Sequence, residues 1–183
     1  MLQKANRYKV LEVFFDDPES TWGFQLRELS RKLKLAPISV KRYLEELSDP
    51  KIGNGQPLIV KIKKRHGYPV YIANRENQYF KFLKKLDMQR RIYESELLEY
   101  LFKECTPRTI ILFGSAFLGE DTLKSDIDLF VLTKEKKLDL KKYELYINRN
   151  IHITFEEDFS NLSKELKNNI INGVILYGYL KVF

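Results

Sequence analysis

The sequence predicts two domains: a small α+β domain of three helices and a hairpin, then an α/β domain with a mixed sheet and flanking helices. The first observation is the helical spacing of apolar residues before residue 50. The second is a pair of apolar strands after residue 107, joined through a Gly-Ser turn. The third is charge: residues 1–91 hold 20 Lys/Arg and 10 Asp/Glu, whereas residues 92–183 hold 12 and 15. We expect boundaries at 1–74, 75–106 and 107–183.

The first domain begins with three predicted helices. Apolar residues recur on one face of 5–15, and a short second helix follows over 25–33. Pro37 occupies a favourable first helical position and opens a third helix that extends to about residue 48. Trp22 and Phe24 are expected to pack in the core at the entry of the second helix.

Two strands are predicted after these helices, over 58–65 and 68–72, around a His66-Gly67 turn. Helix, helix, tight turn, helix and hairpin is the plan of the winged helix-turn-helix, and this part resembles that domain of transcription regulators. The resemblance implies DNA binding, with the third helix in the major groove and the hairpin over a phosphate backbone. The implied contacts are Ser39, Lys41, Arg42, Lys61, Lys63, Lys64 and Arg65.

Two other interpretations of this basic domain remain open. Winged helices also serve as protein-interaction modules, and lysine-rich faces often only keep a protein in solution. The charge asymmetry favours a polyanion partner for the first half of the chain.

The connector lacks Gly and Pro from Glu76 to Glu104, and its apolar residues recur at helical spacing. One long helix and two shorter helices broken near 87–91 are both compatible with this pattern. The segment 76–104 is also the first candidate for a homodimer surface, which would suit a domain that binds a two-fold DNA site.

The most informative motif of the chain follows the connector. An apolar strand ends in Gly114-Ser115, and ten residues later Asp126 and Asp128 flank Ile127 in a second apolar strand. Residues at i and i+2 of a strand point to the same face, so the two carboxylates can share a divalent cation. A Gly-Ser turn lets backbone N–H groups and a hydroxyl approach a phosphate. A surface turn followed by an acidic strand end is the simpler alternative, but it leaves two acids in an apolar strand without a counter-charge.

These residues resemble the signature of the DNA polymerase β nucleotidyltransferase superfamily, and are most similar to its minimal archaeal and bacterial members. The resemblance covers residues 107–183. It implies that Gly114 and Ser115 contact the phosphates of an NTP, ATP being the expected one, and that Asp126 and Asp128 bind Mg²⁺ and are catalytic. Two loop residues just before the aspartates could add phosphate contacts, namely Lys124 and Ser125.

The chain departs from that family in the third carboxylate, which usually comes from a later strand. This chain has His152 at the expected position and Thr154 two residues on. A neutral imidazole does not replace the negative charge that attracts Mg²⁺. Glu156 and Glu157 could substitute, although they are better placed to lead into a helix over 159–171.

Composition limits the remaining possibilities. The apolar content is 44% and no apolar run has the length of a membrane span. The N-terminus shows no signal core, and the single cysteine cannot form an internal disulfide, so we expect a cytoplasmic protein without membrane association. Two histidines and one cysteine exclude a structural zinc site within one chain.

Two functions are compatible with these observations. The first is Mg²⁺-dependent transfer of NMP to a protein or small-molecule acceptor, combined with DNA binding. The second is a DNA-binding regulator or antitoxin whose transferase domain binds nucleotide or a partner without catalysis. Acceptors in the related minimal transferases include proteins, aminoglycoside-like molecules and partner toxins of the HEPN type, so a HEPN-type partner protein is an expected candidate.

Overall fold

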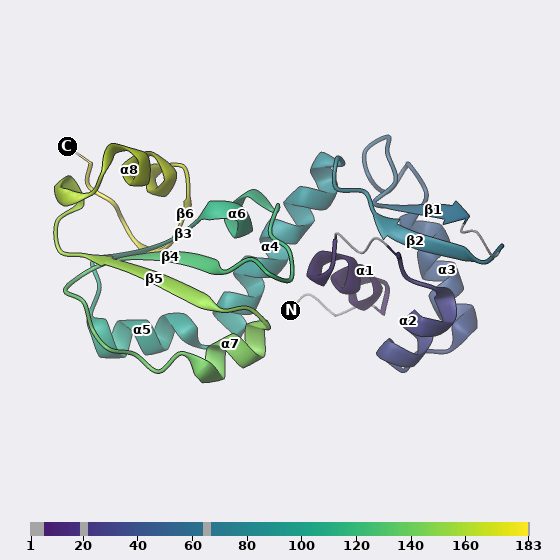
Figure 1. Ribbon diagram of the computed structural model, residues 1–183, viewed down its shortest axis with the longest axis horizontal. Helices are drawn as coiled ribbons and strands as arrows, with labels where there is room; N and C mark the ends of the chain where they lie inside the picture. The colour runs from purple at the N-terminus through teal and green to yellow at the C-terminus, as the bar shows by residue number, and fades with distance from the viewer. Residues whose placement is uncertain (1–5, 19–21, 64–66, 183) are drawn as a thin grey trace. The chain divides into compact units, whose positions relative to one another are not determined.

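The computed structural model describes residues 6–18, 22–63 and 67–182. The chain divides into two compact units, Met1–Lys84 and Lys85–Phe183, and the division falls within one helix (Figure 1). No helix in the described part of the chain is both long enough and apolar enough to cross a membrane.

The first unit contains the three predicted helices. Two of their boundaries have clear local causes: Gln25 and Glu28 form a reciprocal capping box at the start of the second helix, and Lys34 ends it in the left-handed conformation. Pro37 stands in the first turn of the third helix, as predicted. The helices are α1 (Asn6–Asp16), α2 (Leu26–Leu33) and α3 (Pro37–Leu47).

The hairpin is also present, as β1 (Ile59–Lys63) and β2 (Pro69–Ala73) paired antiparallel. Phe24 adds an isolated bridge to Tyr71 and is buried, so its predicted core position is confirmed. The core position predicted for Trp22 is wrong, because its side chain is 78% exposed.

One apolar cluster fills the first unit. It joins all three helices to both strands and to the first turns of the connector. Its fully buried members include Phe14, Phe15, Leu29, Leu44, Ile59 and Phe80.

The connector consists of two helices, α4 (Gln78–Glu94) and α5 (Leu97–Cys105). The break lies at Ser95 and Glu96, a few residues after the 87–91 segment considered from the sequence. Glu96 adopts the left-handed conformation with φ +65°, and the hydroxyl of Ser95 donates to the carbonyl of Ile92. The helix therefore ends by a local turn rather than at Gly or Pro.

The second unit is built on a four-stranded mixed sheet of order β5-β4-β3-β6 (Figure 1). The central strand β3 pairs antiparallel with β4 and with β6, whereas β4 and β5 are parallel. The strands are β3 (Thr109–Phe113), β4 (Ile127–Leu132), β5 (Ile151–Glu156) and β6 (Val174–Gly178).

Helices cover both faces of this sheet, with α5 and α7 on one side and α8 on the other (Figure 1). The predicted helix over 159–171 is a 3₁₀ turn followed by a shorter α-helix. These elements are α6 (Gly114–Leu118), α7 (Lys141–Ile147), η1 (Phe159–Asn161) and α8 (Lys164–Ile171).

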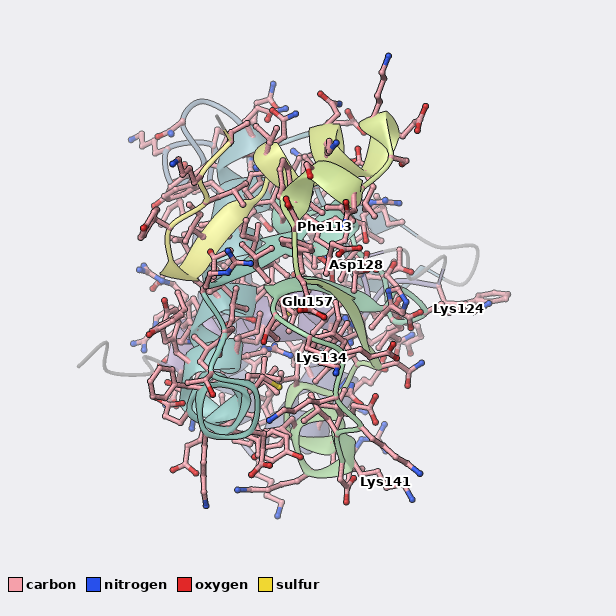
Figure 2. The ribbon with its side chains drawn as sticks, turned by 90° about the vertical axis from the view of Figure 1, so that its left-hand side faces the viewer. Phe113, Lys124, Asp128, Lys134, Lys141 and Glu157 are labelled. Atoms are coloured by element: carbon pink, nitrogen blue, oxygen red, sulfur yellow. The ribbon has the colours of Figure 1, made fainter. Side chains whose placement is uncertain are left out.

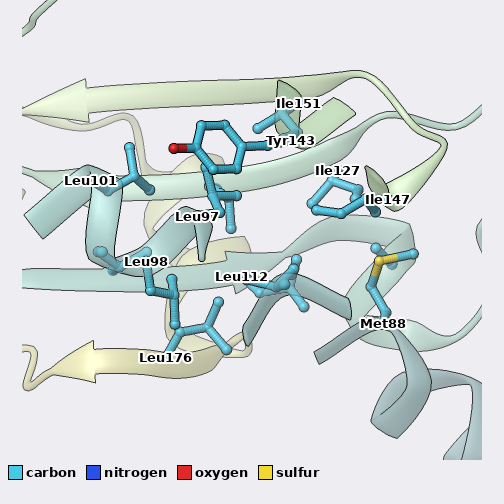
Figure 3. Close-up of a cluster of buried hydrophobic side chains, with 14 of the residues drawn as sticks. Met88, Leu97, Leu98, Leu101, Leu112, Ile127, Tyr143, Ile147, Ile151 and Leu176 are labelled. Atoms are coloured by element: carbon cyan, nitrogen blue, oxygen red, sulfur yellow. The ribbon is translucent and has the colours of Figure 1, made fainter. Parts of the chain in front are cut away.

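Alternation along the strands separates two apolar clusters. Leu112 and Ile127 belong to the larger cluster, with side chains of α4, α5 and α7 (Figure 3). Phe113 and Phe130 point to the opposite face, where Phe159 and α8 cover them. Period-two alternation then places Asp126 and Asp128 on the α8 face, at the end of the strand beyond the buried Phe130.

Candidate active site

The turn at Gly114 lies in close contact with the carboxylate of Asp128. Antiparallel pairing puts Phe113 opposite Asp128, and Figure 2 labels the two side by side. Gly114 has φ +73°, and a Cβ built on it would lie 2.5 Å from Oδ2 of Asp128. Only glycine permits both this backbone conformation and this approach. The local sequence therefore brings a turn suited to phosphate binding next to one carboxylate.

The two aspartates differ in environment. Asp126 is exposed and its Oδ1 accepts a hydrogen bond of 3.1 Å from Nδ2 of Asn150. Asp128 is partly buried, and burial raises the pKa of its carboxyl above the usual range. The nearby His152 lowers that pKa and the charge of Asp126 raises it again. A partly desolvated carboxylate beside a second one attracts a cation strongly.

Strand β5 shows which side chains lie beside the aspartates, where a third carboxylate was expected. Its parallel register places His152 opposite Asp128, Thr154 opposite Phe130, and Glu156 opposite Leu132. Nδ1 of His152 lies 3.5 Å from Oδ1 of Asp128. Glu156 lies four positions further along the strand, which is about 13 Å at 3.3 Å per residue. The face beside the aspartates therefore carries histidine and threonine.

Glu156 has a structural role at the far end of the strand. Its Oε1 accepts hydrogen bonds from the backbone N–H groups of Glu157 and Asp158 and from the side-chain amide of Asn161. The bond from Asn161, followed by the two backbone bonds, lowers the pKa of Glu156. Glu156 thus stabilises the turn into η1 and does not reach the aspartates.

The two carboxylates suit a cation whose other ligands are water and substrate phosphate oxygens. Within residues 6–18, 22–63 and 67–182, no three or more His, Cys, Asp or Glu side chains are grouped so that they could hold a metal ion. Two carboxylates still match Mg²⁺, because it is commonly held by one or two carboxylates together with water and substrate phosphates.

The loop residues proposed for phosphate contact are placed less favourably. The hydroxyl of Ser125 accepts from the backbone N–H of Thr122, and the two hydroxyls lie 3.3 Å apart. Ser125 therefore closes its own turn. Lys124 is exposed and lies apart from Asp128 (Figure 2). Ser115 lies in the first turn of α6, next to Gly114.

A buried ion pair in the second unit was not predicted from the sequence. Asp121 and Arg149 are 2% and 1% exposed at their side chains, and Oδ2 lies 3.7 Å from Nη2. Asp121 lies in the loop between α6 and Asp126, and Arg149 lies two residues before β5. The pair therefore joins the two segments that position the acids and His152. No sequence spacing reveals it, since the partners are 28 residues apart.

The predicted DNA-binding residues belong to the first unit. Lys41 and Arg42 are exposed on α3, whereas Ser39 on the same helix is partly buried. Lys41 pairs with Glu45 at 3.8 Å, and Arg42 lies at the same distance from the carboxylate one turn on. The hairpin residues are divided: Lys61 is exposed on β1 and Lys63 ends that strand, whereas Lys64 and Arg65 lie outside the described residues.

Comparison with known proteins bears on the second unit. The family model described as Polymerase beta, Nucleotidyltransferase matches residues 95–180, from α5 to the end of the sheet. No curated protein and no solved structure matches the chain. The match includes the Gly114 turn and both aspartates, and it leaves the helices and hairpin of the first unit unassigned.

Proposed function

We propose that the chain, which carries a polymerase β nucleotidyltransferase domain at residues 95–180, transfers NMP from an NTP to a protein or small-molecule acceptor. The observation that carries this proposal is the contact geometry of Gly114 with the Asp128 carboxylate. It is the arrangement expected where a phosphate chain and its cation are held together. ATP is the nucleotide we would test first.

Each residue of the site has a separate task in this proposal. The backbone at Gly114 and the hydroxyl of Ser115 contact the phosphates, and Asp126 and Asp128 hold Mg²⁺. Bound Mg²⁺ offsets the charge that develops on the phosphates. The acceptor oxygen forms a bond to the α-phosphorus as the bond to pyrophosphate breaks, so the residues mainly orient the reacting groups.

Label transfer from NTPs tests this activity. Each of the four NTPs, labelled at the α-phosphate, would be incubated with the protein, Mg²⁺ and candidate protein or small-molecule acceptors. We expect the label on an acceptor with wild type and at least a hundredfold less with Asp126→Asn or Asp128→Asn, because each change removes a cation ligand. Equal labelling by these variants would refute the assigned site.

A second function is favoured by a specific observation. His152 and Thr154 occupy the face beside the aspartates, and Glu156 is engaged in the turn after β5. A domain without a third carboxylate can bind nucleotide or a partner protein, such as one of the HEPN type, without catalysis. Nucleotide binding without label transfer to any acceptor would support this regulator or antitoxin.

We extend the proposal to DNA binding by the first unit as a winged helix-turn-helix domain. Its support is the basic surplus of residues 1–91 and the exposed cations on α3 and β1. A 30-base-pair duplex labelled for fluorescence anisotropy tests it. Binding that weakens steeply with salt supports the proposal, and no binding at 50 mM salt contradicts it.

A homodimer through 76–104 is part of the same proposal. Phe82 and Leu86 lie one turn apart on α4 and are 50% and 45% exposed. A pair of exposed apolar side chains on one helix face suits a helix-to-helix contact. Sedimentation of wild type as a dimer and of Leu86→Glu as a monomer would support it, and a monomeric wild type would refute it.

A further inference from the structure

Strand β5 and the residue before it, Asn150, place a second row of polar side chains beside the two aspartates. Asn150 donates to Asp126 at 3.1 Å, and His152 lies 3.5 Å from Asp128. The two rows come from adjacent parallel strands in matched register. An imidazole therefore stands where a third carboxylate was expected, and an amide lies two residues before it.

The position of His152 does not serve the core. Its side chain is 65% exposed, and its Nδ1 faces Oδ1 of Asp128 rather than an apolar neighbour. Two donor atoms that share one cation, each about 2.1 Å from it, lie about 3.0–3.5 Å apart at angles of about 90–110°. The observed separation falls at the upper end of that range. The carboxylate and the imidazole can therefore approach one ion without rebuilding either strand.

The chemistry of the donors distinguishes between cations. Mg²⁺ takes oxygen ligands almost exclusively, whereas imidazole suits first-row transition ions. Mn²⁺ accepts carboxylate, phosphate oxygen and imidazole together. Replacing an expected carboxylate by His152 removes one negative charge and adds one nitrogen donor, and both changes weaken Mg²⁺ more than Mn²⁺.

We propose that His152 is a nitrogen ligand of the cation at this site, and that the site takes a first-row transition ion such as Mn²⁺ in preference to Mg²⁺. This inference rests on the proposed function, because Asp128 supplies the neighbouring ligand. Nucleotide phosphate and water complete the coordination. Asp126 can add Oδ2 to the coordination, because Asn150 donates only to its Oδ1.

Mn²⁺ itself is the probe, because its electron spin reports directly on bound nitrogen. The full-length protein would be labelled uniformly with ¹⁵N and titrated with Mn²⁺, alone and with ATP, by electron paramagnetic resonance. Spin-echo modulation from ¹⁵N can arise only from the protein, since the nucleotide carries ¹⁴N. His152→Asp restores a third carboxylate, and His66→Asn removes the only other histidine.

We expect ¹⁵N modulation with wild type and with His66→Asn, and its loss with His152→Asp. The ratio of Mn²⁺ to Mg²⁺ affinity should fall about tenfold in His152→Asp, the size of change typical of a single altered metal contact. Asp128→Asn should lose the ion altogether.

Three results would overturn the inference, and they separate it from the proposed function. Mn²⁺ that binds through Asp128 without ¹⁵N modulation would leave the metal–nucleotide site intact but exclude His152 as its ligand. Tighter Mn²⁺ binding in His152→Ala would show that the imidazole blocks the ion. No binding of Mn²⁺ or Mg²⁺, with or without ATP, would overturn the inference and the proposed function together.

Discussion

The two units present their candidate functional residues in different ways. In the second unit, backbone register places Asp128 opposite Phe113 and His152, and the turn at Gly114 admits no side chain. In the first unit, Lys41 and Arg42 lie on an exposed helix and face acids one turn on. One site is defined by single close contacts, and the other by the sum of many weak charges.

This difference decides how each unit should respond to substitution. A site built from close contacts loses its geometry when one atom is added or one buried charge is removed. A surface built from exposed charges changes gradually, because each contact contributes little. The predictions below test that contrast, beginning with the largest effect.

The buried pair of Asp121 and Arg149 should give the largest change in stability. Asp121→Asn removes the carboxylate charge 3.7 Å from the buried guanidinium of Arg149, so we expect the free energy of unfolding to fall by about 3 kcal/mol. Urea denaturation measures it. Lys41→Met breaks an exposed pair of the first unit and should cost under about 0.5 kcal/mol. Similar costs for the two variants would contradict the contrast.

Gly114→Ala should have the next largest effect. The new Cβ meets the Asp128 carboxylate at 2.5 Å and the backbone keeps φ +73°, so we expect a loss of about 2 kcal/mol in unfolding free energy. Gly55→Ala is the matched control, because Gly55 has φ +95° with nothing within 4 Å of its Cβ. It should cost about 1 kcal/mol. Retained nucleotide binding in Gly114→Ala would show that the turn does not hold phosphate.

Asp128→Asn should make the protein slightly more stable at neutral pH. Burial raises the pKa of Asp128 in the folded state, so the ionised carboxylate opposes folding. Compared with the variant, the wild type is most stable below the pKa that Asp128 has in the unfolded chain. It loses part of that stability as pH rises through the higher pKa that Asp128 has in the folded state. The variant should therefore gain under about 1 kcal/mol over wild type between pH 3 and pH 7. A variant that is less stable than wild type at pH 7 would contradict this account.

Lys61→Ala should produce the smallest effect, and only on DNA binding. Removing one phosphate contact should reduce the slope of log affinity against log salt by about 0.9, equally for different sequences. Anisotropy titrations at salt concentrations from about 50 to about 200 mM measure this slope. Lys137→Ala, an exposed lysine of the second unit, should leave the slope unchanged. Equal slopes for all three proteins would remove β1 from the DNA-binding surface.

The sequence predicted the elements of both units because their causes are local. Capping at Gln25, the proline at 37 and the glycine at 114 each determine a boundary or turn within a few residues. The predicted three helices, the hairpin and the apolar strands on either side of Gly114 are confirmed. The acids were identifiable for the same reason, since their spacing alone places them on one face.

The remaining features depend on distant pairing. Trp22 was expected in the core, but Phe24 takes the contact with Tyr71 and Trp22 is exposed. Asp121 and Arg149 meet only because β5 runs beside β4. The role of Glu156 could not be predicted either, because it required the parallel register that places it far from Asp128.

Nucleotide-dependent stability tests the central claim most directly. Thermal unfolding would be followed with and without MgATP, on wild type and on Asp126→Asn/Asp128→Asn, with Lys41→Ala/Arg42→Ala as a control in the other unit. At 100 times the Kd, the nucleotide should add about 2.7 kcal/mol of stability to wild type and to the control, and none to the aspartate variant. No shift with any of the four NTPs, or an equal shift in the aspartate variant, would contradict a metal–nucleotide site at Asp126 and Asp128.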